Sequence, residues 1–515
     1  MTGNYELEKR QKGGLLRFTG HPFFDIGAAT IAAFNEKPDI YSITEADLKK
    51  VADYIEREYQ MEPLKSFLGV AFTTNAWFNQ PAFNKHPEKR KEYSNRLLRS
   101  YHQDIPKSSD RCVFTGRLAI AVAFSDKLPD GRAFRQHIPL LTGENVINFY
   151  PWGKVGLPVS GEAILCIQAF PLGCAKCGGR LLAVHSESPN LTYEFAYEFF
   201  KMNQKALTLA HLSGSKKMPE AQFSAKTLLI DTLLKIEQRR HDEANQHILF
   251  SVTAYHINNS GQSNPLDNRN PPLDIYYLPL ELTDFLSHLT SAEYSNEWNA
   301  IKQRAWWLSM KKKKNEKRGK ENVEEEKLLP QRNLLYEDLL RLPLGAGRFI
   351  RRYFLRIPTR TSREEDPRRV YSLKNEAGLV SWKLTELFLR KVMFVNQERI
   401  QQIKELGDRL AMYVNNENNR HFFTSFYIEQ RSYNNLRNSL IKANVEHVKR
   451  GNPPLITLDP YLTIFEDGDE VGKSDWRLAR DLVLIRMIEK LYNLGWIGKN
   501  SEAIPEILDN EISQD

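Results

Sequence analysis

The C-terminal part of the chain has the most regular pattern of apolar and polar positions. From Asn375 onward, apolar residues recur at helical spacing and predict helices at 375–392, 397–414, 422–449 and 475–494. Two of these apolar faces consist of Ile400, Ile403, Leu406, Leu410 and Tyr413, and of Leu478, Leu482, Ile485 and Ile488. Four successive helices of this kind predict a C-terminal four-helix bundle.

The preceding sequence mixes helical and strand patterns. Thr44 and Asp47 form a capping-box pattern, which predicts a helix that runs to Tyr59. Two further helices are predicted at 193–212 and 226–244, and strands are predicted at 118–124, 162–170, 181–184, 248–257 and 274–278. The expected fold class is therefore α+β, with a mixed N-terminal body followed by the helical bundle.

Charge marks the expected boundaries between these parts. A run of lysines at 311–314 and a run of glutamates at 324–326 predict a charged, solvated loop. The segment after it is rich in arginine. The predicted domains are an N-terminal body at 1–309, a charged loop at 310–331, an arginine-rich connection at 332–374 and a bundle at 375–515.

Composition limits the class of protein. A chain of 515 residues is too long for one hydrophobic core. Four cysteines are too few for a disulfide framework and favour a reducing cytoplasm, and no apolar run is long enough to predict a membrane span. The net charge of +8 is modest for this length, so the distribution of charge is more informative than its total.

Arginines alternate with apolar and aromatic residues in the connecting segment. Guanidinium groups suit phosphate oxygens and can stack on bases, so this pattern predicts a track along RNA or DNA backbone. Its members are Arg348, Arg351, Arg352, Arg356 and Arg360.

A second candidate surface lies at 73–87, where amides alternate with aromatic residues. Amides suit base edges and aromatic rings suit stacking, and a lysine there can reach phosphate. The alternative is a polar loop that is anchored by core aromatics, and the sequence leaves both interpretations open. The candidate residues are Asn75, Asn79, Gln80, Asn84 and Lys85.

The cysteine pattern has the outline of a degenerate zinc ribbon. Cys112 is followed by Thr115 where a second thiol would stand, and Ser160 and Ala163 occupy the corresponding positions of a second knuckle. The one intact Cys-x-x-Cys, at 174–177, needs two further ligands, for which Cys112, Cys166 and His185 are the available residues. No metal and no other cofactor is expected.

Four motifs in the first part of the chain resemble one family in their order and spacing. They read Phe-Thr-Gly-His-Pro-Phe-Phe-Asp-Ile-Gly at 18–27, Cys-Val-Phe-Thr-Gly-Arg at 112–117, Asn-Phe-Tyr-Pro at 148–151 and Gly-Gly-Arg-Leu-Leu-Ala-Val-His at 178–185. The sequence resembles the CXXC-CXXC family of large subunits from type I-B CRISPR surveillance complexes (Cascade). The degraded knuckles are a departure from the family pattern.

The resemblance implies a cytoplasmic, non-catalytic subunit of an antiviral defence complex. Its implied nucleic-acid ligands are the 5′ end of the guide RNA, the protospacer-adjacent motif in duplex DNA and the displaced single strand of the R-loop. Its implied protein partners are the backbone and 5′-handle-binding subunits, a small subunit and a separate helicase-nuclease, with no membrane. By similarity, Gln80 would be a glutamine wedge, Lys85 or Lys154 a lysine finger, and 153–156 a glycine loop.

Two functions from other classes remain as alternatives. A metal-dependent nuclease could use the His241-Asp242 dipeptide with His211 and with Asp267 or Asp274. A stand-alone binder of single-stranded nucleic acid would use the same arginines without guide or partners.

Overall fold

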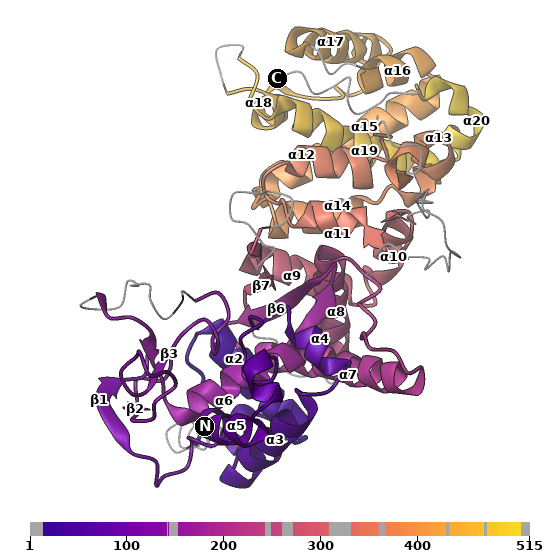
Figure 1. Ribbon diagram of the computed structural model, residues 1–515. Helices are drawn as coiled ribbons and strands as arrows, with labels where there is room; N and C mark the ends of the chain where they lie inside the picture. Colours follow the sequence, from indigo (N-terminus) through magenta and orange to yellow (C-terminus); the bar gives the residue numbers. More distant parts are fainter. Residues whose placement is uncertain are drawn as a thin grey trace. The chain divides into compact units, whose positions relative to one another are not determined.

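The computed structural model divides the chain into two compact units, Met1–Leu280 and Glu281–Asp515 (Figure 1). It describes residues 14–141, 143, 153–242, 249–259, 271–307, 331–359, 366–428, 432–467 and 471–505. The division falls at Leu280, earlier in the chain than the boundary at 309 that the charge pattern indicated. Apart from Gln331, the expected charged loop at 310–331 lies outside the described residues.

The first unit contains helices and short antiparallel sheets. Its α-helices are α2 (Pro22–Phe34), α3 (Glu45–Glu58), α4 (Leu64–Leu68), α5 (Pro87–Leu98), α6 (Gly161–Ala169), α7 (Pro189–Leu212) and α8 (Ala225–Asp242). Its strands are β1 (Lys107–Arg111), β2 (Leu118–Ile120), β3 (Arg132–Ala133), β4 (Leu157–Pro158), β5 (Ala175–Cys177), β6 (Arg180–Ser186), β7 (Val252–Ile257) and β8 (Leu273–Leu278). Mixed helix and sheet confirms the α+β prediction in its general form.

Helix α2 is the centre of the first unit. Pro22 begins the helix, where its missing N–H is no loss, and His21 Nδ1 accepts a hydrogen bond from the N–H of Phe23. The helix is buried from Phe24 to Ala33 and packs against α6, α7 and β6. A helix that is apolar on all sides is stable only inside a core, which is where α2 lies.

The largest sheet has the strand order β5-β6-β7-β8 and is antiparallel throughout. Strand β6 is buried along its whole length, whereas β8 at the edge is partly exposed. The strands predicted at 181–184, 248–257 and 274–278 are thus confirmed, with ends that differ by a few residues.

The strand predicted at 162–170 is wrong, because these residues form helix α6. Every residue of α6 is buried, so its sequence is apolar without alternation. A short apolar run of this kind fits a buried strand and a buried helix equally well.

The second unit is almost entirely helical. Its α-helices are α9 (Leu280–Leu289), α10 (Ser295–Gln303), α11 (Leu334–Leu339), α12 (Ala346–Phe349), α13 (Leu373–Glu376), α14 (Trp382–Lys391), α15 (Gln397–Glu417), α16 (Arg420–Ile428), α17 (Tyr433–Lys449), α18 (Leu458–Phe465), α19 (Trp476–Asn493) and α20 (Trp496–Lys499). A two-stranded ladder joins β9 (Trp306–Trp307) to β10 (Arg332–Asn333).

Helices α15 and α19 form the most extensive helix pair of this unit. Ile400, Ile403, Leu406 and Leu410 of α15 are buried, as their helical spacing predicted. The helix predicted at 422–449 is instead two helices, α16 and α17, and α18 adds a further one. Four helices therefore do not account for the unit, although its helical character is confirmed.

In the part of the chain that the structure describes, no helix combines the length and apolarity that crossing a membrane requires.

The first unit is expected to lose stability in mild acid through His256. Burial, and next the charge of Arg180, lower the pKa of His256 from 6.5 to about 4, and its Nε2 donates to the Cys177 carbonyl at 3.0 Å. Between pH 6.5 and about pH 4, His256 binds a proton in the unfolded chain but stays neutral in the folded chain. The free energy of unfolding should therefore fall by up to about 3 kcal/mol as the pH drops from 7 to 4.

Urea unfolding at several pH values would measure this loss. His256→Gln keeps an N–H for the Cys177 carbonyl but does not titrate, so its stability should vary less with pH. An identical pH dependence in the wild-type chain and His256→Gln would contradict the assignment.

Candidate nucleic-acid interface

Residues 73–86, which we call the amide loop, are fixed by their aromatic side chains. Trp77 and Phe78 are each only 2% exposed, and Trp77 Nε1 donates to Gln168 Oε1 at 3.2 Å. The Tyr59 hydroxyl donates to the Gln168 carbonyl at 2.6 Å. These aromatic residues therefore anchor the loop, and their burial leaves their rings unavailable for stacking on bases.

The amides of the loop are exposed or half-buried. Asn75, Asn84 and Lys85 are exposed, while Asn79 and Gln80 are half-buried. Asn84 Oδ1 accepts a hydrogen bond from Arg90 Nη2 at 2.8 Å.

Within the described residues, no hydrogen bond or ion pair is formed by the side chains of Asn75, Asn79, Gln80 and Lys85. Lys89 and Lys91 of the following helix α5 are also exposed and share this property. Amide and ammonium groups on a fixed backbone are thus free to meet a ligand.

Lys154 lies in a different part of the first unit. Its side chain is exposed, and Nζ is 4.0 Å from Asp110 Oδ1 on β1. Gly153 and Gly156 have φ values of 62° and 67°, which glycine adopts without strain. Among the described residues, no hydrogen bond or ion pair links Lys154 to the amide loop.

Three of the arginines predicted for a backbone track are instead bonded inside the second unit. Arg356 is fully buried, donates to Glu376 Oε2 from Nε at 3.2 Å and Nη2 at 3.0 Å, and lies 4.1 Å from the centre of the Tyr371 ring. A guanidinium in this position cannot reach phosphate.

Arg351 and Arg352 are held by acids of the same unit. Arg351 Nε donates to the buried carboxylate of Asp481 at 2.8 Å, and Arg352 Nη1 is 3.5 Å from Asp338 Oδ2. Their charges are largely neutralised where they lie, which leaves less free positive charge for a phosphate track than the sequence pattern predicted.

Arg348 is the exception among the described members of the predicted track. It lies on α12, is exposed, and has no recorded ion pair in the described part of the chain. Arg360 lies outside the described residues.

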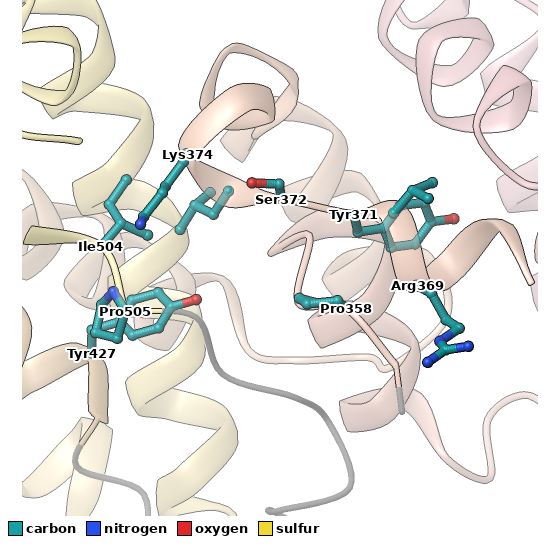
Figure 2. Close-up of a pocket in the computed structure, with 10 residues that line it drawn as sticks. Pro358, Arg369, Tyr371, Ser372, Lys374, Tyr427, Ile504 and Pro505 are labelled. Carbon is teal, nitrogen blue, oxygen red and sulfur yellow. The ribbon is translucent and has the colours of Figure 1, made fainter. Parts of the chain in front are cut away.

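A pocket of about 390 Å³ lies beside the arginine segment in the second unit (Figure 2). The backbone from Arg369 to Lys374 forms one side, and Tyr427 and Pro505 lie on another. Tyr371 lines the pocket, and its ring lies 4.1 Å from the Arg356 guanidinium.

Two of the sequence motifs meet at the start of α2. The Asp25 carboxylate accepts hydrogen bonds from the N–H and hydroxyl of Thr19 at 2.8 and 3.0 Å. His185 Nε2 lies 3.0 Å from the other oxygen of Asp25, and Phe18 stacks on the His185 ring. These motif residues connect α2 to β6 and have a structural role that the sequence did not reveal.

The two degenerate knuckles also lie together. Thr115 Oγ1 and Ser160 Oγ are 3.3 Å apart, and Arg117 forms an ion pair with Glu162 at 2.9 Å. In the described residues, however, no three His, Cys, Asp or Glu side chains are grouped so as to hold a metal ion.

The cysteines are buried and unpaired. Cys174 Sγ contacts the Phe170 carbonyl at 3.2 Å, and burial raises the pKa of the Cys177 thiol to about 12. Burial therefore favours the protonated form of the Cys177 thiol at neutral pH.

The residues considered for a nuclease do not come together. Arg239 near the end of α8 bonds Glu194 and Glu198 in the first turns of α7. His241 lies two residues after Arg239 on α8. His211 lies at the opposite end of α7 from Glu194, about 25 Å away along a helix that rises 1.5 Å per residue. Asp274 is paired with Arg180, and Asp267 lies outside the described residues.

Two residues that hold the amide loop were not identified from the sequence. Gln168 is 1% exposed and bonds Trp77, Tyr59 and the His137 carbonyl. A single amide within an apolar run is the signal that could have identified it. Asn259 donates from its N–H and its Nδ2 to the carbonyls of Val70 and Ala71, each at 2.9 Å, and has no comparable signal.

Comparison with known proteins yields no match to a family model, to a curated protein or to a solved structure.

Proposed function

We propose that this chain is the non-catalytic large subunit of a type I-B CRISPR RNA-guided DNA surveillance complex. The motifs at 18–27, 112–117, 148–151 and 178–185 suggest the family. The observation that carries the proposal is the amide loop, which presents unpaired amides and lysines from a backbone fixed at Gln168 and Asn259. Contacts that distinguish base edges need such a fixed backbone.

In this proposal the protein reads only a short motif in duplex DNA. Base pairing to the guide RNA reads the rest of the target sequence. Asparagine and glutamine can each make two hydrogen bonds to adenine in the major groove, and lysine suits guanine or phosphate. Gln80, Asn79 and Lys85 supply these groups, and Lys89 and Lys91 on α5 add positive charge for the DNA backbone.

The second unit has a different role in the proposal. Because Arg351, Arg352 and Arg356 are bonded to acids, we assign them to holding its helices together. Arg348 and the exposed faces of the helices remain for contacts with RNA, displaced DNA and the partner subunits. Recruitment of a separate helicase-nuclease then accounts for cleavage.

Native mass spectrometry of the tagged chain from its own host, with sequencing of bound RNA, tests the proposal. We expect repeated backbone subunits and RNAs that share a constant 5′ handle. A lone chain that binds single strands equally well without RNA or partners would favour the stand-alone binder. Cleavage of DNA by the isolated chain, stopped by a chelator, would favour a nuclease.

Replacing Gln80 and Lys85 together by alanine should weaken motif-dependent DNA binding at least tenfold. Each good base contact contributes about 1–3 kcal/mol of discrimination. Binding of the assembled complex to duplexes with and without the motif, measured by filter binding, gives the ratio.

Lys50→Ala is the matched control, because it removes an exposed lysine from α3. Subunit composition should be unchanged in both variants. A motif preference that survives in Gln80→Ala/Lys85→Ala would exclude these two residues from the reading site.

A further inference from the structure

Helix α17 is buried on one side only. It lies at the outer edge of the second unit, beside α16 (Figure 1). On the opposite side, three aliphatic residues remain in solvent: Ile441 is 50% exposed, Val445 45% and Val448 44%. Neighbouring apolar side chains that stay exposed on one face mark a surface for interaction with another molecule. The buried side of the helix consists of Leu436, Leu440 and Ala443.

The exposed aliphatic residues have the spacing of a coiled-coil seam. Four residues separate Ile441 from Val445, and three separate Val445 from Val448. Two exposed asparagines, Asn434 and Asn438, continue the same spacing toward the start of the helix. At 100° per residue, all five positions fall within about 80° of one another, and they extend for about 21 Å, or two heptads. We call these five residues the α17 stripe, and one helix lying alongside α17 would match its shape.

Two lysines follow the α17 stripe along one side. Lys442 and Lys449 are both exposed, and within the described residues neither has a recorded hydrogen bond or ion pair. Two nearby acids already have other contacts. Glu446 is half-buried and interacts with Tyr413 of α15, and Glu417 at the end of α15 pairs with Arg450. The lysine charges are therefore free to attract an acidic partner.

The same lysines argue against a second copy of this chain as the occupant. In a pair of helices, the residues that flank the seam face the flanking residues of the partner and determine which partners are accepted. Two antiparallel copies of α17 would place Lys442 opposite Lys449, and two parallel copies would place Lys442 opposite Arg437. Like charges would meet in both orientations, which disfavours the pairing.

The composition of the α17 stripe argues against a lipid surface and against nucleic acid. Helices that lie on membranes carry Trp, Phe or Leu on the apolar face. The stripe instead has asparagine at two of its five positions and has no aromatic residue. Phosphate groups would attract the two lysines, but they would gain little from the three aliphatic side chains between the asparagines and the end of the helix.

We propose that the α17 stripe is the docking site for one helix of a partner protein, with aliphatic residues at its own seam and Glu or Asp beside them. The acids would pair with Lys442 and Lys449. Asn438 would fix the register, as a polar residue at a seam position does in coiled coils. Two heptads form a small interface, so we expect reversible binding. The inference uses only α17 and its neighbours and does not depend on the function proposed above.

Two designed helical peptides test the proposal with the full-length chain. Both have three heptads with Ile and Leu at the seam, and they differ only in the flanking residues, which are Glu in one peptide and Lys in the other. Fluorescence anisotropy should show about tenfold tighter binding of the glutamate peptide. The preference should decrease as the salt concentration rises, because salt screens exposed charges.

Substitutions on the exposed side of α17 locate the binding site. Val445→Ser removes an aliphatic side chain from the stripe and should weaken binding of the glutamate peptide about tenfold. Lys442→Glu/Lys449→Glu should reverse the preference, so that the lysine peptide binds more tightly. Leu458→Ser is the matched control, since Leu458 is 68% exposed on α18 and lies outside the stripe. It should bind both peptides as the wild-type chain does.

Several results would overturn the docking site. Equal binding of the two peptides, binding of neither, or an unchanged preference in Lys442→Glu/Lys449→Glu would each do so. A wild-type dimer that light scattering shows to dissociate in Val445→Ser would assign the stripe to a second copy. Binding to phosphatidylserine vesicles that Val445→Ser abolishes would assign it to a membrane, and displacement of the glutamate peptide by a 20-base-pair duplex would assign it to nucleic acid.

The chain's own acidic C-terminal residues are the remaining competitor for the α17 stripe. Residues 506–515 contain four acids and no basic residue. The proposal expects the glutamate peptide to bind the full-length chain and a chain that ends at residue 505 with equal affinity. Binding that appears only after residues 506–515 are removed would assign the stripe to this segment and would overturn a partner helix.

Discussion

Arg356→Met should lower the free energy of unfolding of the second unit by about 3 kcal/mol. The change leaves the Glu376 carboxylate, which is only 7% exposed, with Arg304 Nε at 2.6 Å as its remaining guanidinium partner. It also removes the cation from the Tyr371 ring. Loss of one member of a buried ion pair is costly because the other charge stays desolvated.

Hydrogen exchange measured by mass spectrometry can locate the effect. Peptides that span α13 and α19 should exchange faster in Arg356→Met, whereas peptides of α2 in the first unit should not change. Arg348→Met is the matched control, since its guanidinium is exposed on the same segment. It should leave exchange unaltered.

A double-mutant cycle with Glu376→Gln measures the interaction free energy between Arg356 and Glu376 separately from their contacts with other residues. If the two groups stabilise one another, Arg356→Met should cost less when Glu376 is already neutral. Equal exchange in Arg356→Met and the wild-type chain, combined with weaker binding of single strands, would restore Arg356 to the nucleic-acid surface.

The arginine segment shows what the sequence alone could not decide. Arginines among apolar residues fit a phosphate track, and they fit buried ion pairs equally well. The difference depends on which acids the fold brings to each arginine: Asp338 lies within the same segment as Arg352, Glu376 is 20 positions from Arg356, and Asp481 is 130 positions from Arg351. The spacing of the arginines does not indicate that these acids will approach them.

For the amide loop, both sequence interpretations contributed. The aromatic residues Trp77 and Phe78 anchor the loop in the core, as the alternative interpretation held, and two of its four amides are exposed while the other two are half-buried, which the binding interpretation allows. The buried aromatic residues are the anchors, and the amides that remain in contact with solvent are the candidates for binding. Sequence spacing predicted the loop and its chemistry, but the anchors Gln168 and Asn259 depend on tertiary contacts.

Helix periods and strand alternation predicted several of the elements, including α3, α7, α8, β6, β7 and β8. They failed at α6, where complete burial removes the periodicity on which the prediction depends. The knuckle outline placed Thr115 and Ser160 at corresponding positions, and in the structure their hydroxyls are 3.3 Å apart. The missing thiols are sufficient reason to expect no zinc there.

Gly27→Ala should destabilise the first unit by more than about 3 kcal/mol, or prevent it from folding. A Cβ at this position would lie 1.9 Å from the carbonyl oxygen of Cys166, in the backbone of α6. A backbone atom of a buried helix cannot rotate away as a side chain can, so α2 and α6 would have to separate. Ser160 stands just before α6, and the separation would therefore also disturb its contact with Thr115.

Gly347→Ala is the control for this substitution, because a Cβ there meets no atom within 4 Å. Alanine is the better helix former, so this variant should be as stable as the wild-type chain or up to about 1 kcal/mol more stable. Urea unfolding followed by circular dichroism compares the two. A Gly27→Ala protein with wild-type stability would mean that α2 and α6 are not packed as closely as described. The glycine that ends the 18–27 motif would then have no steric reason to be a glycine.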